Sequence, residues 1–204
     1  MPLTYFVSAL VTLIVVVDPV GLVPTFLSLT HGVPEKERRS IALRACFIAG
    51  TILAGTALVG DWLLSVLSIT IPAFRIAGGL LLFSVAYEMV LGVRIGRQSR
   101  QAEEAVEERV SDVAAFPLAI PLLAGPGAIT ATLLLAGQAG AQPLLVGVLL
   151  ATVVIAVTAC LAAFVVATRI DRLLGITGNV VLSRLLGVLL AALAVQFIID
   201  GLRN

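Results

Sequence analysis

Charged side chains are scarce in this sequence. Asp, Glu, Lys and Arg make up 12% of its 204 residues, about half of the roughly 25% that is typical of a soluble domain. Hydrophobic residues reach 60%, and the mean hydropathy is +1.14. Because long apolar runs recur along the whole chain, the composition excludes an ordinary soluble domain and predicts an integral membrane protein.

Residues that carry catalysis or bind metals are also few. His31 is the single histidine, and the two cysteines, Cys46 and Cys160, lie in apolar runs at no metal-ligand spacing. These counts argue against a haem or zinc centre and a Ser–His arrangement. The sequence also contains no GxxxxGKS phosphate-binding loop. We therefore expect no enzyme activity, no cofactor and no nucleic acid partner. Both cysteines should be buried as small hydrophobic residues.

Six segments are apolar over the roughly 20 residues that a membrane-spanning helix needs. Barrel strands would alternate polar and apolar residues, which these runs do not do. The predicted class is therefore an all-α integral membrane protein with six transmembrane helices. The segments are residues 3–30, 41–66, 71–91, 113–139, 143–167 and 185–202.

Basic residues are concentrated on one side of this predicted topology. Eleven of the 13 Lys and Arg residues fall in the loops after the first, third and fifth helices, whereas Arg75 and Arg203 fall on the other side. The positive-inside rule places the basic loops in the cytoplasm and both termini outside a plasma or inner membrane. The longest such loop, residues 94–112, mixes four Arg with five acidic residues. That mixture is typical of a solvated connector, although a regulatory or partner site is the alternative.

The two halves of the chain resemble each other. Residues 75–92 match residues 184–201 without a gap at an offset of 109, and residues 18–25 match residues 125–132 at an offset of 107. Shared Leu and Gly alone would be weak evidence, but the two motifs recur in the same order. Three helices per half would give an inverted repeat, a common plan for secondary transporters. The predicted units are 1–92, a cytoplasmic connector 93–112, and 113–204.

The first segment contains residues that break helices. It is too long for one straight span, and it carries Asp18, Pro19, Gly21 and Pro24 near its middle. One half-helix should end near Val17, and a second should begin near Pro19, or near Pro24 if the whole stretch is unwound. Asp18 either caps the second half-helix, contacts a ligand's ammonium group, or carries a coupling proton.

The fourth segment repeats this pattern. Pro117 and Pro121 interrupt its apolar run, and Gly125–Pro126 should cap and begin a second half-helix. Two breaks in corresponding places near the midplane predict a central polar cavity, although prolines can also merely kink a helix. Thr25 and Thr130 lie just beyond the two breaks and could add hydroxyl contacts to a substrate.

The two motifs together resemble the signature stretches of the MarC family. The matching stretches are DPVGLVPTFLSLT at 18–30 and PLLAGPGAIT at 121–130. The resemblance implies an inverted three-plus-three repeat in the plasma membrane, with small neutral amino acids such as glycine or alanine held between the two interrupted helices. Carried over residue by residue, it implies that the substrate-binding residues are Asp18, Pro19, Gly21 and Pro24 in the first motif and Gly125, Pro126, Gly127 and Thr130 in the second. Leu22 stands where family members often have Asn, which removes one ligand contact.

The leading hypothesis is therefore a secondary transporter of a small neutral amino acid, with H⁺ or Na⁺ as the coupling ion. An exporter or channel-like protein for another small metabolite is the alternative. The sequence leaves the oligomeric state and the direction of transport open.

Overall fold

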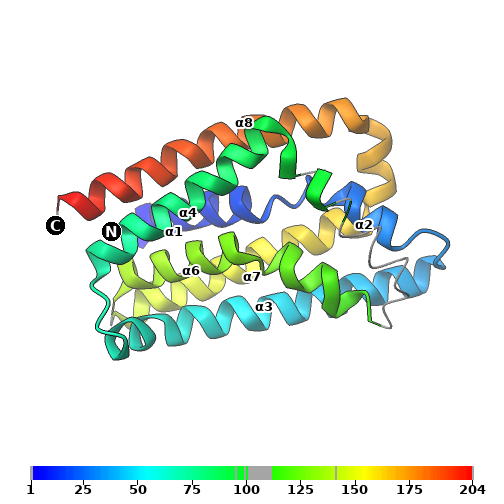
Figure 1. Ribbon diagram of the computed structural model, residues 1–204. Coiled ribbons are helices and arrows are strands. Elements are labelled where there is room, and N and C mark those ends of the chain that lie inside the picture. The colour runs from blue at the N-terminus through cyan, green and yellow to red at the C-terminus, as the bar shows by residue number, and fades with distance from the viewer. Residues whose placement is uncertain (1, 95, 99, 101–111, 141, 204) are drawn as a thin grey trace.

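The computed structural model describes residues 2–94, 96–98, 100, 112–140 and 142–203, and these residues include no β-strand. The helices lie side by side in an elongated bundle with both termini at the same end (Figure 1). The all-α prediction is confirmed. In chain order the helices are α1 (Pro2–Val17), α2 (Val23–Leu29), α3 (Glu35–Val66), α4 (Ile71–Leu91), η1 (Ala114–Leu123), α6 (Pro126–Ala139), α7 (Pro143–Val165) and α8 (Ala167–Leu202).

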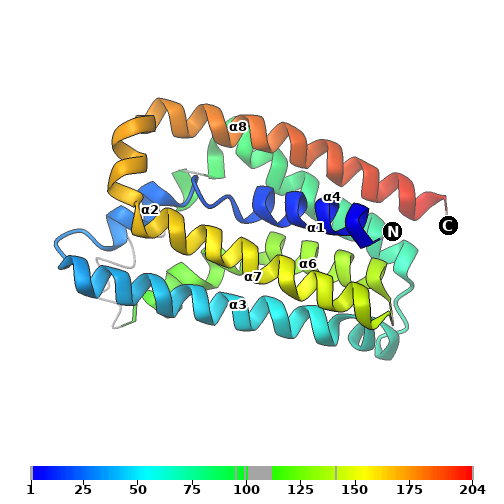
Figure 2. The same cartoon turned by 180° about the vertical axis from the view of Figure 1, so that it is seen from behind.

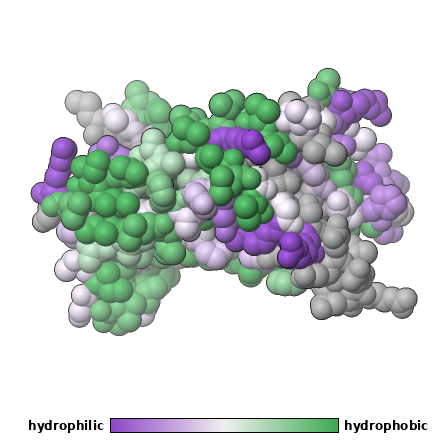
Figure 3. Space-filling view, turned by 45° about the horizontal axis from the view of Figure 1, so that its top comes forward, coloured by the Kyte–Doolittle hydropathy of each residue, from purple (hydrophilic) through white to green (hydrophobic). Residues whose placement is uncertain are grey.

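The surface of the bundle suits a lipid environment. Large apolar side chains such as Phe47 and Leu173 are 76% and 84% exposed, and hydrophobic residues cover large parts of the face in Figure 3. Four stretches are long and apolar enough to cross a membrane: Glu35–Gly60, Ile71–Leu91, Pro143–Val165 and Thr177–Leu202. The bent η1–α6 pair would be a fifth, whereas α1 is shorter. These described helices make the chain a multi-pass membrane protein.

Two helix boundaries differ from the sequence prediction. α3 begins at Glu35 and not at residue 41, because Pro34 precedes a run of good helix formers whose first-turn Glu residues complement the helix dipole. α8 begins at Ala167 and not at residue 185, with non-helical geometry at Gly175, whose φ is 58°. The predicted loop over residues 168–184 was therefore wrong. The charged residues there form helix on both sides of a kink at Gly175.

Helices from the two halves pack against each other in pairs. α4 lies along α8, and α3 lies along α7 (Figures 1 and 2). A Cβ on Gly79 would lie 2.8 Å from the Ala194 carbonyl oxygen, and a Cβ on Gly187 would lie 3.1 Å from the Ala86 carbonyl oxygen. Both glycines therefore allow close approach of the two backbones. Gly79 and Gly187 lie 108 residues apart, and so do Ala86 and Ala194. This spacing is one residue less than the offset of 109 in the sequence match.

The core of the bundle contains the ends of several helices. Phe26 of α2 stacks on Phe164 of α7, with ring centroids 4.4 Å apart. The Tyr5 hydroxyl of α1 donates a hydrogen bond to the Leu135 carbonyl of α6 at 2.8 Å. Both cysteines are buried, as predicted. These contacts hold α2 against α7 and α1 against α6, and so fix the chain segment that joins α1 and α2.

Candidate substrate cavity

The chain leaves the helical conformation after α1 at Asp18. This residue has a φ of +54°, in the left-handed region that few residues other than glycine adopt. Its carboxylate is buried and accepts two hydrogen bonds, from the Gly21 N–H at 3.0 Å and from the Ser183 hydroxyl of α8 at 3.0 Å. The Leu22 N–H also bonds to the Asp18 carbonyl oxygen at 3.2 Å. Asp18 therefore stabilises the turn before α2 and ties that turn to α8.

The helix that follows, α2, begins later than it would if Asp18 were its N-cap residue. α2 starts at Val23, its capping position is Leu22, and Pro24 lies in its first turn. The alternative with an unwound stretch is thus the one observed, and Pro19 is not the first helical residue. Gly21 is required here for a simple reason. A Cβ at that position would collide with the Asp18 carboxylate.

The break before α6 has a different local cause. η1 is a wide, irregular helix in which Phe116 and Ile120 are extended. Each precedes a proline, Pro117 or Pro121, whose ring disfavours the helical conformation of the residue before it. Both X–Pro peptide bonds are cis. The axes of η1 and α6 differ by 55°.

α6 begins as the sequence predicted. Gly125 is extended and occupies the capping position, and Pro126 lies in the first turn. A Cβ on Gly125 would run into the Pro121 carbonyl oxygen, so only glycine allows this approach. Among the described residues no side chain caps this helix, and its first N–H groups retain their partial positive charge. Gly127 brings three helices together, because a Cβ there would lie 3.3–3.4 Å from Val85 of α4 and Val16 of α1.

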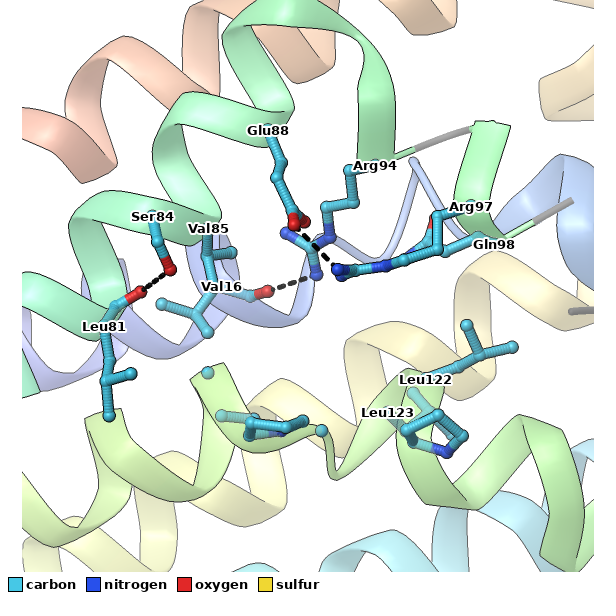
Figure 4. A pocket seen from close by; sticks show the side chains of 15 residues that line it. Val16, Leu81, Ser84, Val85, Glu88, Arg94, Arg97, Gln98, Leu122 and Leu123 are labelled. Carbon is cyan, nitrogen blue, oxygen red and sulfur yellow. Dashed lines mark hydrogen bonds and ion pairs between the residues drawn. The ribbon is translucent and has the colours of Figure 1, made fainter. Parts of the chain in front are cut away.

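A cavity of about 330 Å³ opens at this junction. It lies between the end of α1, one face of α4, the η1–α6 break and the turn that follows α4 (Figure 4). Its wall is mixed, with charged side chains on the α4 side and apolar side chains of η1 opposite. The lining residues are Val16, Leu81, Ser84, Val85, Glu88, Arg94, Arg97, Gln98, Pro121, Leu122, Leu123, Gly125, Pro126, Gly127 and Ala128.

Arg94 is a buried cation in this wall, with 8% of its surface exposed. α4 ends at Gly92, whose φ of 75° reverses the chain in a left-handed cap. The turn directs Arg94 back toward α1, where its guanidinium donates to the Val16 carbonyl at 2.8 Å and contacts the Met89 sulfur at 3.0 Å. Burial lowers the pKa of Arg94 from its ordinary value, and the Asp18 carboxylate opposes that shift. A guanidinium nevertheless stays charged in proteins.

Glu88 and Arg97 form an ion pair on the same wall. Their nitrogen and oxygen are 2.7 Å apart, and Figure 4 shows both side chains beside Arg94. Glu88 Oε2 is buried and has no hydrogen-bond partner among the described residues. Its free oxygen could accept a hydrogen bond from a cationic ligand group. The wall thus carries two positive charges and one negative charge next to a helix N-terminus.

Only part of the predicted site reaches this cavity. Gly125, Pro126 and Gly127 line it, but Thr130 does not. From the first motif Asp18, Pro19, Gly21, Pro24 and Thr25 do not line it either, and Val16 is the residue near that break that does. Pro24 instead borders a narrow space with no room for a water molecule. The two breaks lie close together, yet the open space is on the side of the second.

Sequence reasoning missed the charged wall. It placed Arg94 in a solvated connector, whereas the structure buries this residue against α1. Most of that connector, residues 101–111, lies outside the described residues. The one available signal was Gly92, because a glycine after an apolar helix often marks a left-handed cap that turns the chain back.

Comparison with known proteins identifies the family. The model of a family described as "MarC family integral membrane protein" matches residues 3–204 of this chain. The chain belongs to the MarC family. It is 38% identical over 207 residues to a UPF0056 membrane protein of Methanocaldococcus jannaschii, covering 100% of this chain and 98% of the relative. It is 34% identical over 193 residues to the UPF0056 membrane protein YhcE of Escherichia coli K12, covering 94% and 89%.

A third MarC family relative, a UPF0056 membrane protein of Archaeoglobus fulgidus, is 38% identical over 201 residues, covering 98% of this chain and 93% of the relative. No solved structure matches this chain. The printed names describe membrane proteins and assign no substrate. The functional argument therefore depends on the geometry of the cavity.

Proposed function

We propose that this MarC family chain is a secondary transporter and that the cavity beside α6 holds its substrate. The observation that carries the proposal is a cavity of about 330 Å³ at an uncapped helix start, with charges of both signs in its wall. Ionisable groups and irregular backbone inside a membrane bundle are costly, and they are tolerated chiefly where they line a functional, solvated space. Broken helices at such a space are typical of secondary transporters.

Paired packing supports an inverted repeat of residues 1–92 and 113–204. α1 packs on α7 while η1 packs on α3, and α2 packs on α8 while α6 packs on α4. In each of these two cases, a helix of the first half packs on the second half in the same way as its counterpart in the second half packs on the first. The reciprocal contacts of Gly79 and Gly187 have the same character, as expected for a two-fold relationship. Rocking of one half against the other would expose the cavity to each side of the membrane in turn.

The proposed placement is in a plasma or inner membrane with six spans. The α1–α2 pair and the η1–α6 pair each form one span, interrupted near the midplane at residues 18–22 and 124–125. The connector 93–112 lies on the cytoplasmic side, where Arg94, Arg97 and Gln98 reach back into the wall of the cavity, and both termini lie outside. The shared end of the two termini in Figure 1 agrees with this orientation, as does the concentration of basic residues in the opposite loops.

A small neutral amino acid such as glycine or alanine is the proposed substrate, with H⁺ or Na⁺ as the coupling ion. The cavity volume is at the lower end of the range of about 300–1,000 Å³ typical of ligand pockets, so a small solute fits best. Charges of both signs suit a zwitterion. The resemblance of the stretches 18–30 and 121–130 to the MarC signature motifs implies the same substrate class.

Uptake of labelled glycine or alanine into proteoliposomes tests this function. The wild-type protein should accumulate one of them when an H⁺ or Na⁺ gradient is imposed, and Gly125→Val, which closes the start of α6 against Pro121, should abolish uptake. Gly147→Ala is the matched control, since a Cβ at Gly147 meets no atom within 4 Å. If no small neutral amino acid is transported or bound under any gradient, the substrate assignment is wrong.

A further inference from the structure

We propose that Arg94 is the receptor for the carboxylate of the transported solute. This inference rests on the proposed function and makes it more specific: the solute must carry a free carboxylate, and a residue beyond the last turn of α4 recognises it. The argument starts from the cost of burying a cation. A guanidinium with only 8% of its surface exposed requires compensation from hydrogen bonds and from a counter-ion.

The protein supplies only part of that compensation. Among the described residues the ion pairs are Arg44–Asp112 and Arg97–Glu88, and neither includes Arg94. Its two contacts are a neutral carbonyl, on Val16, and the Met89 thioether, a weak acceptor. A guanidinium has five N–H donors in a fixed fork that matches a carboxylate. The Asp18 and Glu88 carboxylates act on Arg94 only through space, without an ion pair. Arg94 therefore keeps free donors and only partial compensation of its charge in the wall of the cavity.

The opposite side of the cavity also favours a carboxylate. The uncapped start of α6 contributes N–H groups from Gly127 and Ala128, and both residues line the cavity. Arg97 is already neutralised by Glu88, so the net charge of the wall comes from Arg94. A carboxylate placed between Arg94 and the α6 N-terminus would thus meet a positive charge on one side and a helix dipole on the other.

Glu88 then orients the second end of the solute. One carboxylate oxygen pairs with Arg97, and the other is buried without a partner. An α-ammonium group directed at this free oxygen would satisfy it. Arg94 and Glu88 both lie on the α4 side of the cavity in Figure 4. They would therefore bind the two ends of a short zwitterion and leave its side chain facing Leu122 and Leu123.

Binding measurements with three small probes test this assignment. The purified protein in nanodiscs is titrated with glycine, with glycinamide, which lacks the carboxylate, and with acetate, which lacks the ammonium group. Wild-type protein should bind glycine at least about 10-fold more tightly than glycinamide, as expected for a lost charge-assisted hydrogen bond. Acetate should bind weakly but measurably.

Substitution of Arg94 separates recognition from folding. Arg94→Gln should reduce the affinity for glycine by about 10- to 100-fold and abolish acetate binding, so that glycine and glycinamide bind equally. A purely structural role would weaken all three ligands in proportion and leave the glycine-to-glycinamide ratio unchanged, which would overturn the proposal. Arg94→Lys keeps the charge and should preserve part of the preference, which provides the test if the Gln variant does not fold. Arg44→Gln, which removes an exposed arginine that does not line the cavity, is the matched control.

The outcomes distinguish this inference from the proposed function. If the wild type transports glycine and Arg94→Gln retains its preference for glycine, the transporter stands and the role of Arg94 is wrong. If acetate binds in an Arg94-dependent manner but no amino acid is transported, the carboxylate receptor stands and the amino acid substrate is wrong. If inorganic phosphate binds Arg94 more tightly than any carboxylate, the inference is overturned.

Discussion

The Ser183 hydroxyl donates a hydrogen bond to the Asp18 carboxylate at 3.0 Å, although 165 positions separate the two residues in the chain. The same carboxylate accepts from the Gly21 N–H. This one buried acid therefore holds the turn between α1 and α2 and joins it to α8. It explains why this chain carries a carboxylate in the apolar segment between α1 and α2 that does not line the cavity.

Asp18→Asn tests whether the Asp18 carboxylate stabilises the fold or contacts the ligand. Asn keeps one acceptor oxygen and loses the charge, so we expect the free energy of unfolding to fall by about 1–3 kcal/mol. Ser183→Ala removes a single partner and should cost about 0.5–1.5 kcal/mol. The measurement is thermal or denaturant unfolding in detergent. The double variant should be less damaging than the sum of the singles, because both substitutions act on the same hydrogen bond. Unchanged stability with lost uptake would instead indicate that Asp18 contacts ligand.

Gly125→Ala should disrupt the start of α6. The new Cβ would collide with the Pro121 carbonyl oxygen, so the break must open and the cavity wall must shift. We expect uptake and glycine binding to fall at least about 10-fold, with a loss of stability of about 1–3 kcal/mol. Binding by calorimetry and unfolding by fluorescence check the two effects separately. A Gly125→Ala protein that binds glycine like the wild type would show that the close approach to Pro121 is unnecessary.

Gly79→Ala and Gly187→Ala test the relationship between the two halves. In each variant the added Cβ meets a backbone carbonyl of the partner helix, from Ala194 or Ala86. The two substitutions should therefore cost similar free energies of unfolding, about 1–3 kcal/mol each. Gly55→Ala in α3 is the control, because open space surrounds Gly55, and it should be neutral or stabilising by up to about 1 kcal/mol. A large cost at one glycine alone would contradict the two-fold arrangement.

Cysteine labelling in intact cells tests the orientation. A cysteine at Lys36, in the first turn of α3, should react with a membrane-impermeant maleimide only after permeabilisation, since this end is placed in the cytoplasm. A cysteine at Ile69, between α3 and α4, should react from outside. The native Cys46 and Cys160 are buried and should stay unlabelled. The reverse pattern would invert the proposed topology.

The sequence predicted the all-α membrane class from its long apolar runs. It also predicted where the helical chain is interrupted and where α6 begins, because Gly and Pro act locally. The sequence prediction failed at residues whose position depends on contacts between helices. Arg94 is a basic residue after an apolar helix, which normally indicates a solvated loop, yet the left-handed Gly92 turns it into the bundle. Residues 168–184 were read as a loop from their charge, but they belong to α8. A single sequence does not distinguish an arginine that faces water from one that faces a carbonyl inside the bundle.

The most direct test of the account is an experimental structure of the protein in nanodiscs with saturating glycine. The account predicts density for one glycine in the cavity, with its carboxylate between the Arg94 guanidinium and the first N–H groups of α6, and its ammonium group toward Glu88. An empty cavity under conditions in which glycine is bound, or glycine density away from Arg94 and α6, would contradict it.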